Sequence, residues 1–123
     1  MTPRGERGSA TIWVLSCCVL LMVVAGVATV RGLAVVARHR AEASADLAAL
    51  AAAGRIGVAD DGCAVAARIA ASNGTRLVSC RLSSGPDGRS GTVLVRVEYR
   101  VRLPIVGGKE VTATARAARL PAA

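Results

Sequence analysis

The stretch AVVARHRAEASADLAALAAA, residues 34–53, decides the fold, because it predicts a helix that leaves an apolar segment and continues into water. It is rich in alanine, the residue with the highest helix propensity, and contains neither glycine nor proline. The spacings of three and four residues that mark one face of a helix occur at Leu33, Val36, Arg40, Ala43, Leu47 and Leu50. We expect this face to make the helix amphipathic, and we expect Gly54 to end the helix as its C-cap.

An apolar segment precedes this stretch. From Ser9 to Val30, 22 consecutive residues carry no charge, and about 20 apolar residues suffice for a helix to cross the hydrocarbon layer of a bilayer. The apolar region of a cleavable signal peptide is shorter, about 7–15 residues, and is followed by a small-residue cleavage motif. The sequence therefore predicts a retained membrane anchor and one long helix from Thr11 to Ala53, with its first half in lipid.

The expected organisation has four regions: a leader at residues 1–8, a transmembrane helix at 9–31, a continuing amphipathic helix at 32–54 and a small α+β domain at 55–123. A water-exposed part of this size has a small core and gains from a covalent staple. Cys63 and Cys80 form one disulfide if this part faces an oxidising compartment, whereas the alternative is two buried free cysteines. Cys17 and Cys18 lie inside the apolar run, where they pack as small hydrophobic residues or carry a lipid.

A short helix is expected between the long helix and the strands. Its predicted bounds are Asp61–Ser72, with Asp60 or Asp61 capping its start and Asn73-Gly74 as a left-handed stop. A bond between Cys63 and Cys80 would tie this helix to the first strand.

Three later segments alternate apolar and polar side chains, which is the period of a half-buried strand: RLVSCRL (76–82), TVLVRVEYRVRLP (92–104) and VGGKEVTATARAA (106–118). The predicted inward positions are Val78, Cys80, Leu82, Val93, Val95, Val97, Tyr99, Val101, Leu103, Val111, Ala113, Ala115 and Ala117. Gly107-Gly108 is the expected two-residue hairpin between the last two strands. We expect a three-stranded antiparallel meander packed on the emerging helix, and hence an α+β fold.

The formal net charge of +8 does not by itself indicate a nucleic-acid partner. Residues 1–40 hold five Arg and one Glu, so half of the excess flanks the apolar segment, where lipid headgroups attract cations. The chain has one Trp, one Tyr and no Phe, and therefore no aromatic platform on which single-stranded bases could stack. We expect a solvated basic surface and no nucleic acid.

No residue pattern predicts catalysis. His39 is the single histidine and lies between Arg38 and Arg40, whose positive charges disfavour its use as a metal ligand. Residues 60–62 (Asp-Asp-Gly) lack the further oxygen ligands of a calcium loop. The glycine-rich residues 83–91 lack the lysine and the following helix of a phosphate-binding loop. The sequence thus predicts a protein that is not an enzyme and holds no metal or cofactor.

The junction at residues 7–12, Arg-Gly-Ser-Ala-Thr-Ile, opens the apolar run directly after a glycine, with cations just upstream. It resembles the short-leader type IV prepilin signal of Flp/Tad systems. Residues 35–53 resemble the TadE-like minor pseudopilins, above all the actinobacterial group called helicase/secretion neighbourhood TadE-like proteins, in which a Cys…Asn-Gly…Cys region also recurs. The resemblance implies a pilin-like fold, cleavage between Gly8 and Ser9 by a prepilin peptidase, and assembly with other pilin-like subunits.

Trp13 occupies the position, five residues after the expected cut, at which type IV pilins and TadE proteins usually have glutamate. In the family this glutamate pairs with the amine of a neighbouring subunit. Its absence favours a role at the filament tip or in initiation, while the alternative is that Trp13 anchors the helix at the membrane interface.

The small residues Ala25, Gly26, Ala28 and Thr29 offer a surface for close approach of a partner helix in lipid. The resemblance implies a single-pass protein of the cell membrane with a cytoplasmic N-terminus and an extracytoplasmic C-terminal domain. The cations after the apolar run outnumber those before it and favour the opposite orientation. Two other functions stay open: an unprocessed single-pass adaptor or regulator of a secretion ATPase, and a signal-anchored secreted binding domain.

Overall fold

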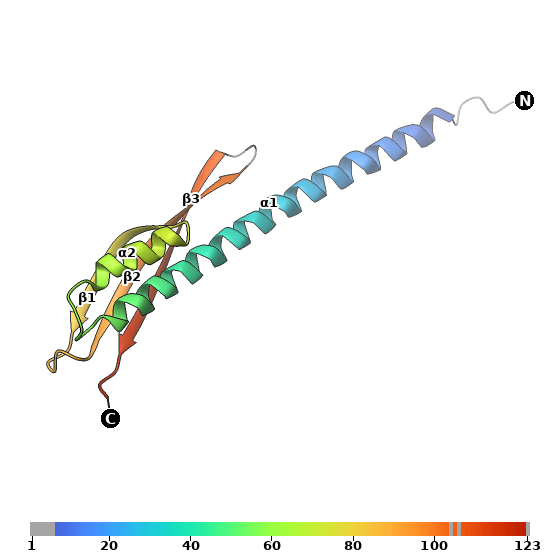
Figure 1. Ribbon diagram of the computed structural model, residues 1–123. Coiled ribbons are helices and arrows are strands. Elements are labelled where there is room, and N and C mark those ends of the chain that lie inside the picture. Colours follow the sequence, from blue (N-terminus) through green and yellow to red (C-terminus); the bar gives the residue numbers. More distant parts are fainter. Residues whose placement is uncertain (1–6, 104, 106, 123) are drawn as a thin grey trace, which may run out of the picture. The chain divides into compact units, whose positions relative to one another are not determined.

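The computed structural model describes residues 7–103, 105 and 107–122. Its elements are α1 (Arg7–Gly54), α2 (Gly62–Ser72), β1 (Arg76–Ser84), β2 (Gly91–Leu103) and β3 (Gly107–Arg119) (Figure 1). The expected α+β class, with one long helix, one short helix and three antiparallel strands, is confirmed. The chain divides into two compact units, residues 1–33 and 34–123, which are described separately.

The 34–123 unit is a sheet in the order β1-β2-β3 with helices on one face only. Its core is one cluster in which alanines of α1 and α2 meet the inward side chains of the strands. The fully buried strand residues are Val93, Val95 and Val97, and the alanines of β3 beside them are almost as buried. The predicted alternation of β2 and β3 is therefore confirmed where the helices cover the sheet.

The buried face of α1 differs from the predicted one. The sequence interpretation put the packing face on Leu33, Val36, Ala43, Leu47 and Leu50, but these side chains are exposed, Leu50 to 62%. The residues buried instead are Ala37, Ala41, Ser44, Ala45, Ala48, Ala49, Ala52 and Ala53. Small side chains let the helix lie close to the sheet and to α2, so the closeness of packing decided the face here, and not the size of the apolar side chains.

The first strand also differs from its predicted alternation. A bulge between Leu77 and Ser79 shifts the register of β1 against β2. The extra residue turns Val78 outward, where it is exposed, and lets Leu77 pack against the core beside Cys80. A bulge inserts one residue into a strand and so reverses the alternation on one side of it, which explains the wrong prediction for Val78.

Two predicted turns are displaced. α1 ends at Gly54 as expected, but the left-handed glycine is Gly57, with a φ of 73°. Its missing Cβ would lie 2.9 Å from the carbonyl oxygen of Gly88, so close approach of two loops also requires glycine there. Gly107-Gly108 was the predicted hairpin turn, but these two residues are the first residues of β3, and the connection to β2 precedes them. The left-handed stop predicted at Gly74 is confirmed.

A buried pair of hydroxyl groups fixes α1 against the turn before β1. The Oγ atom of Ser44 lies 2.6 Å from Oγ1 of Thr75, and Thr75 donates its hydroxyl hydrogen to the carbonyl oxygen of Ala70 at 3.0 Å. Because that hydrogen is used, Ser44 is the donor to Thr75. This chain of hydrogen bonds links α1, the C-terminus of α2 and the start of the sheet.

Candidate functional site

The predicted processing junction lies in the first turn of α1. Gly8 and Ser9 are helical and exposed, and no described atom outside the helix lies within 4 Å of the place that a Cβ would take at Gly8. Residues 1–6 of the predicted leader lie outside the described residues. The described chain therefore leaves this junction open to an enzyme acting from outside.

The first part of α1 presents apolar side chains on every side. Among the described residues, α1 is the one helix that is long and apolar enough to cross a membrane, judged by its length and composition. The most apolar stretch of this helix is not buried. Trp13 is 72% exposed near its start. A helix that is apolar all round needs an apolar environment, either lipid or partner helices.

The small residues predicted to face a partner helix lie on this part of α1. Thr29 donates its hydroxyl hydrogen to the carbonyl oxygen of Ala25 at 2.8 Å, one turn earlier. The polar group of Thr29 is thereby satisfied within its own helix. Gly26 and Ala28 are exposed beside it, and no described atom outside the helix occupies the space next to Gly26. The surface can accept the backbone of another helix at short distance.

The second part of α1 also keeps an apolar stripe on its surface. Val36, Leu47 and Leu50 are exposed within the 34–123 unit, on the side of the helix that does not face the sheet. Because the alanine face is fully used by the core, this stripe is available to a partner.

The structure joins Cys63 of α2 to Cys80 of β1. Their sulfur atoms are 2.03 Å apart and their Cα atoms 5.8 Å apart. The predicted disulfide is confirmed, and it ties the short helix to the first strand. Cys17 and Cys18 are free and exposed on α1.

A bidentate ion pair closes the loop between the two helices, and sequence reasoning missed it. Arg55 donates from Nε to Oδ1 of Asp61 at 2.7 Å and from Nη2 to Oδ2 at 3.1 Å. Asp61 stands at the N-cap position of α2 but makes no side-chain capping bond, so its predicted capping role is wrong. Hydrogen bonding from Arg55 lowers the pKa of Asp61 below its ordinary value of 3.8, against a smaller opposing effect of desolvation.

This ion pair predicts a loss of stability in acid. Since the folded state lowers the pKa of Asp61, the pair stabilises the fold above the ordinary carboxyl pKa, and the contribution disappears as pH falls through the folded value. Between about pH 5 and about pH 2 we expect wild type to lose more stability than the Asp61→Asn variant. Thermal unfolding across this range measures the difference, and equal losses in both proteins would contradict it.

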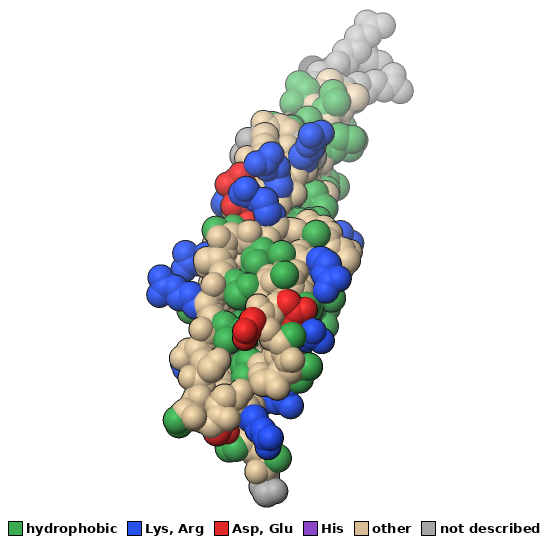
Figure 2. Space-filling view, turned by 60° about the vertical axis from the view of Figure 1, so that its left-hand side comes forward, with side chains coloured by type: hydrophobic (Ala, Val, Ile, Leu, Met, Phe, Trp, Pro, Cys, Tyr) green, Lys and Arg blue, Asp and Glu red, His purple; other side chains and the backbone are tan. Residues whose placement is uncertain are grey.

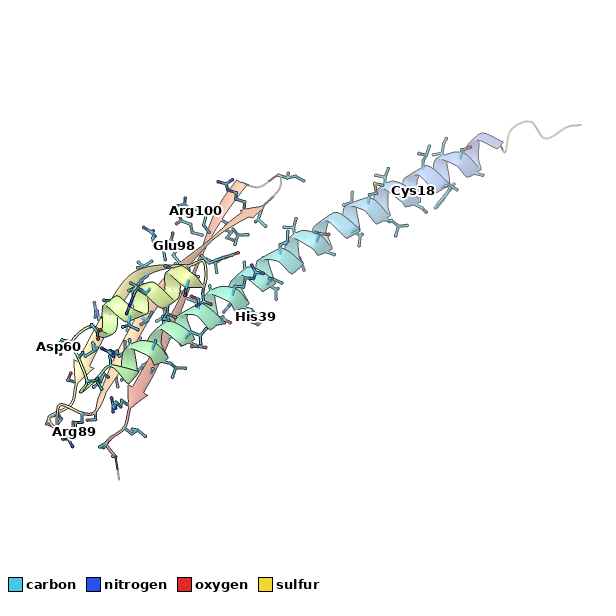
Figure 3. The ribbon with its side chains drawn as sticks, in the orientation of Figure 1. Cys18, His39, Asp60, Arg89, Glu98 and Arg100 are labelled. Carbon is cyan, nitrogen blue, oxygen red and sulfur yellow. A yellow bond between two sulfur atoms is a disulfide. The ribbon has the colours of Figure 1, made fainter. Side chains whose placement is uncertain are left out.

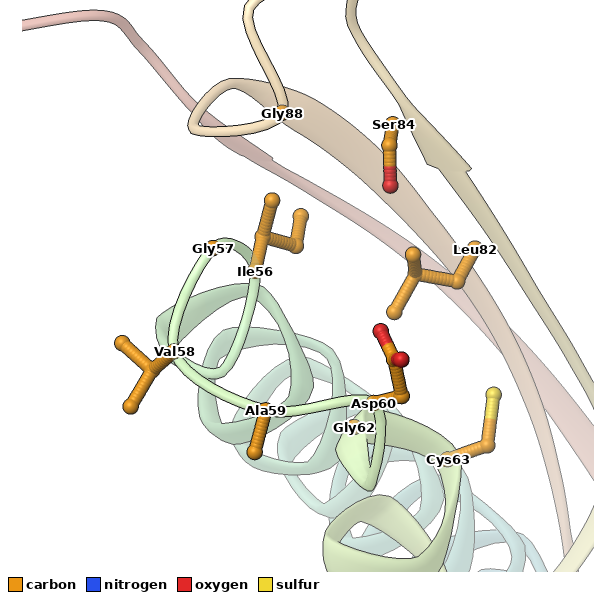
Figure 4. A pocket seen from close by; sticks show the side chains of 10 residues that line it. All are labelled: Ile56, Gly57, Val58, Ala59, Asp60, Gly62, Cys63, Leu82, Ser84 and Gly88. Atoms are coloured by element: carbon orange, nitrogen blue, oxygen red, sulfur yellow. The ribbon is translucent and has the colours of Figure 1, made fainter.

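A pocket of about 440 Å³ lies between the loop that joins the helices and the loop that joins β1 to β2. Asp60 and Ser84 point into it from opposite sides, with Leu82 and Cys63 beside them (Figure 4). Asp60 is the single carboxylate among its lining residues. The side chains that line the pocket therefore supply one carboxylate and one hydroxyl group.

His39 lies on the exposed surface of α1 (Figure 3). Its Nδ1 atom is 3.7 Å from Oε2 of Glu42, and the other carboxylate oxygen of Glu42, Oε1, accepts a hydrogen bond from Nε of Arg38 at 2.9 Å. Within residues 7–103, 105 and 107–122, no three His, Cys, Asp or Glu side chains are close enough to hold a metal ion.

On the face shown in Figure 2, basic side chains occur at several separate places. On the bare face of the sheet, Arg76 is paired with Glu98 and Arg100 with Glu110. These pairs divide the positive charge on this face into separate groups.

Residues 8–55 match the family described as putative Flp pilus-assembly TadE/G-like. This range covers nearly the whole of α1, and the match confirms the resemblance to TadE-like proteins. No curated protein and no solved structure matches the chain. The match and the apolar helix together fit a membrane-anchored component of pilus assembly.

Proposed function

Because residues 8–55 match the TadE/G-like Flp pilus-assembly family, we propose that this chain serves as a minor pseudopilin of a Flp/Tad-type pilus or a related secretion apparatus. A prepilin peptidase cuts between Gly8 and Ser9, and the mature helix assembles with other pilin-like subunits. The observation that carries the proposal is the family match along a helix whose apolar sides are exposed in both units.

The two parts of α1 offer two different surfaces for contact with partner subunits during assembly. In lipid, the surface formed by Ala25, Gly26, Ala28 and Thr29 admits a partner helix closely. Outside lipid, Val36, Leu47 and Leu50 offer an apolar stripe that the chain's own core leaves uncovered. The proposal needs no catalytic step, metal, cofactor or nucleic acid: the partners are other pilin-like subunits, the peptidase and the bilayer.

The proposed orientation has a cytoplasmic N-terminus and an extracytoplasmic 34–123 unit. The Cys63–Cys80 bond supports it, because disulfides persist in oxidising compartments. Trp13 at the position of the usual pilin glutamate favours a place at the filament tip or in initiation, since an indole cannot pair with a neighbouring amine as a carboxylate does.

The cleavage site is tested by the Gly8→Val variant. A bulky β-branched side chain at the open junction should block the peptidase, so the membrane fraction of cells with an active prepilin peptidase should hold only uncut protein. Wild type should begin at Ser9 by intact mass and N-terminal sequencing. Gly26→Val is the matched control, because it places the same side chain on the same helix and should leave cleavage unchanged.

Two outcomes contradict the proposal. A wild-type chain that still begins at Met1 would favour an unprocessed adaptor or regulator of a secretion ATPase. A chain found free in the medium from about Arg38 onward, with no membrane-bound form, would favour a secreted binding domain.

A further inference from the structure

The tip of the β2–β3 hairpin presents an apolar side chain that no described residue covers. Ile105 is 102% exposed and has a φ of 88°, a backbone region that β-branched residues rarely occupy. Leu103 before it is only partly buried, because the core ends near Tyr99. Pro104 and Val106 lie outside the described residues. An exposed isoleucine in an unfavourable backbone region needs an explanation.

Two cations flank this tip on opposite faces of the hairpin. By the alternation of the strands, Arg102 belongs to the bare face of the sheet and Lys109 to the face that the helices cover. Both are exposed, and within the described part of the chain neither makes an ion pair. The neighbouring carboxylate of Glu110 is already paired with Arg100 at 3.0 Å. An apolar tip between free cations suits the boundary between anionic headgroups and acyl chains.

Two contacts show the direction in which α1 runs along the sheet. Arg119, at the end of β3, donates to the carbonyl oxygen of Gly54 at 3.2 Å, so the end of α1 lies beside the end of the sheet away from the tip. Ten residues earlier on α1, Ser44 contacts Thr75, and the residue after Thr75 pairs with Glu98 of β2. Followed back from Gly54, α1 therefore runs toward the hairpin tip.

The lengths of the two elements place the tip at the start of the unit. From Glu98 to Leu103, five residues of strand advance about 17 Å. From Ser44 back to Ala34, ten residues of helix advance about 15 Å. The tip is therefore about level with Ala34, the first residue of its compact unit. Along the chain, Ala34 follows shortly after the end of the uncharged run at residues 9–30.

We propose that the β2–β3 hairpin is a second membrane contact, in which Ile105 and Leu103 enter the interface of the bilayer that holds α1. Arg102 and Lys109 bind the anionic headgroups around it. The site rests on the proposed membrane anchoring and deepens it, because it holds the 34–123 unit against the bilayer surface through a point separate from α1.

The test uses the full chain in nanodiscs of phosphatidylcholine and phosphatidylglycerol with brominated acyl chains, which quench indole emission at short range. Wild type reports on α1 through Trp13, the single tryptophan. The Trp13→Phe/Ile105→Trp variant moves the indole to the hairpin tip. The Trp13→Phe/Val58→Trp variant is the matched control, because Val58 is 63% exposed and follows the end of α1 away from the tip.

We expect brominated lipid to quench the indole at position 105 about as strongly as Trp13, and to leave the indole at position 58 unchanged. If position 105 behaves like position 58 while Trp13 is quenched, the hairpin contact is wrong and the membrane anchoring stands. If Trp13 itself is not quenched, the anchoring fails and the hairpin contact fails with it. Unchanged thermal unfolding of the variants shows that the tip substitution leaves the fold intact.

The role of the cations is tested in the same background. Arg102→Gln and Lys109→Gln are added together to the Trp13→Phe/Ile105→Trp variant. In discs that contain phosphatidylglycerol, the ratio of inserted to free hairpin, measured by quenching of the indole at position 105, should fall about fivefold for each cation removed. Arg81→Gln with Arg89→Gln removes the same charge elsewhere in the unit and should have no such effect. An equal loss in both pairs of variants would reduce the proposal to a non-specific attraction of a basic protein and overturn the assigned headgroup contacts.

Discussion

Replacing Cys63 and Cys80 together by serine will lower the free energy of unfolding of the 34–123 unit by about 3 kcal/mol. The bond closes a segment with a sequence separation of 17, and a crosslink of this length restricts the unfolded chain by that amount in the chain-entropy model. The unit has a core built from alanine and valine, so it has little other stabilisation to spare. For a unit of this size, the expected fall in Tm is roughly 12–24 °C.

Thermal unfolding of the detergent-solubilised full chain, followed by far-ultraviolet circular dichroism, measures this change in the signal of the sheet. The matched control is Cys17→Ser with Cys18→Ser, which removes the same number of sulfur atoms from free, exposed positions and should leave the Tm of the 34–123 unit unchanged. A reducing agent should lower the Tm of wild type and not that of the Cys63→Ser/Cys80→Ser variant. The same Tm in oxidised and reduced wild type would contradict the prediction.

The second large effect is expected from one added side chain on the alanine face of α1. Ala48 is 0% exposed within the core cluster that α1 and α2 form with the strands, and leucine there must displace the side chains around it. Overpacking of this kind costs about 1–3 kcal/mol. The Ala48→Leu variant should therefore unfold at a clearly lower temperature than wild type.

Ala43→Leu is the control for this experiment, because it makes the same substitution on the exposed side of the same helix. Its free energy of unfolding should stay within about 0.5 kcal/mol of the wild-type value. The two variants also decide between the predicted and the observed face of α1. If Ala43→Leu destabilised the protein and Ala48→Leu did not, the face on Leu47 and Leu50 would be the packed one.

The error about this face has a physical origin in the sequence itself. The leucines and the alanines of residues 34–53 both recur at spacings of three and four residues, so periodicity alone predicts two candidate faces. Hydrophobicity selects the leucines, whereas the fold selects the side chains small enough for close approach to the sheet. The alternation of β2 left no such choice, because a strand has two faces and one of them carries charges.

The contacts that sequence reasoning missed join side chains across loops. Arg55 and Asp61 are separated by a left-handed glycine at position 57, whose turn brings them together. Arg119 reaches the carbonyl oxygen of Gly54 from the other end of the chain. The disulfide was predictable because only two cysteines lie outside the apolar run. Patterns along the chain show which residues share an element, but not which exposed arginine meets which carbonyl or carboxylate.

The position of the Cys63–Cys80 bond has a mechanical consequence. A subunit held in a structure that is pulled bears tension between its membrane helix and the surface that its partners grip. Under such a load α1 can separate from the sheet along the alanine face. Among the described residues, the side-chain hydrogen bonds that join α1 to the rest of the unit are those of Ser44 with Thr75 and of Arg119 with the carbonyl oxygen of Gly54. The residues between Cys63 and Cys80 cannot extend, because the bond carries the force past them. Tension would thus lengthen the chain at the joint between α1 and α2 and stop at the covalent link.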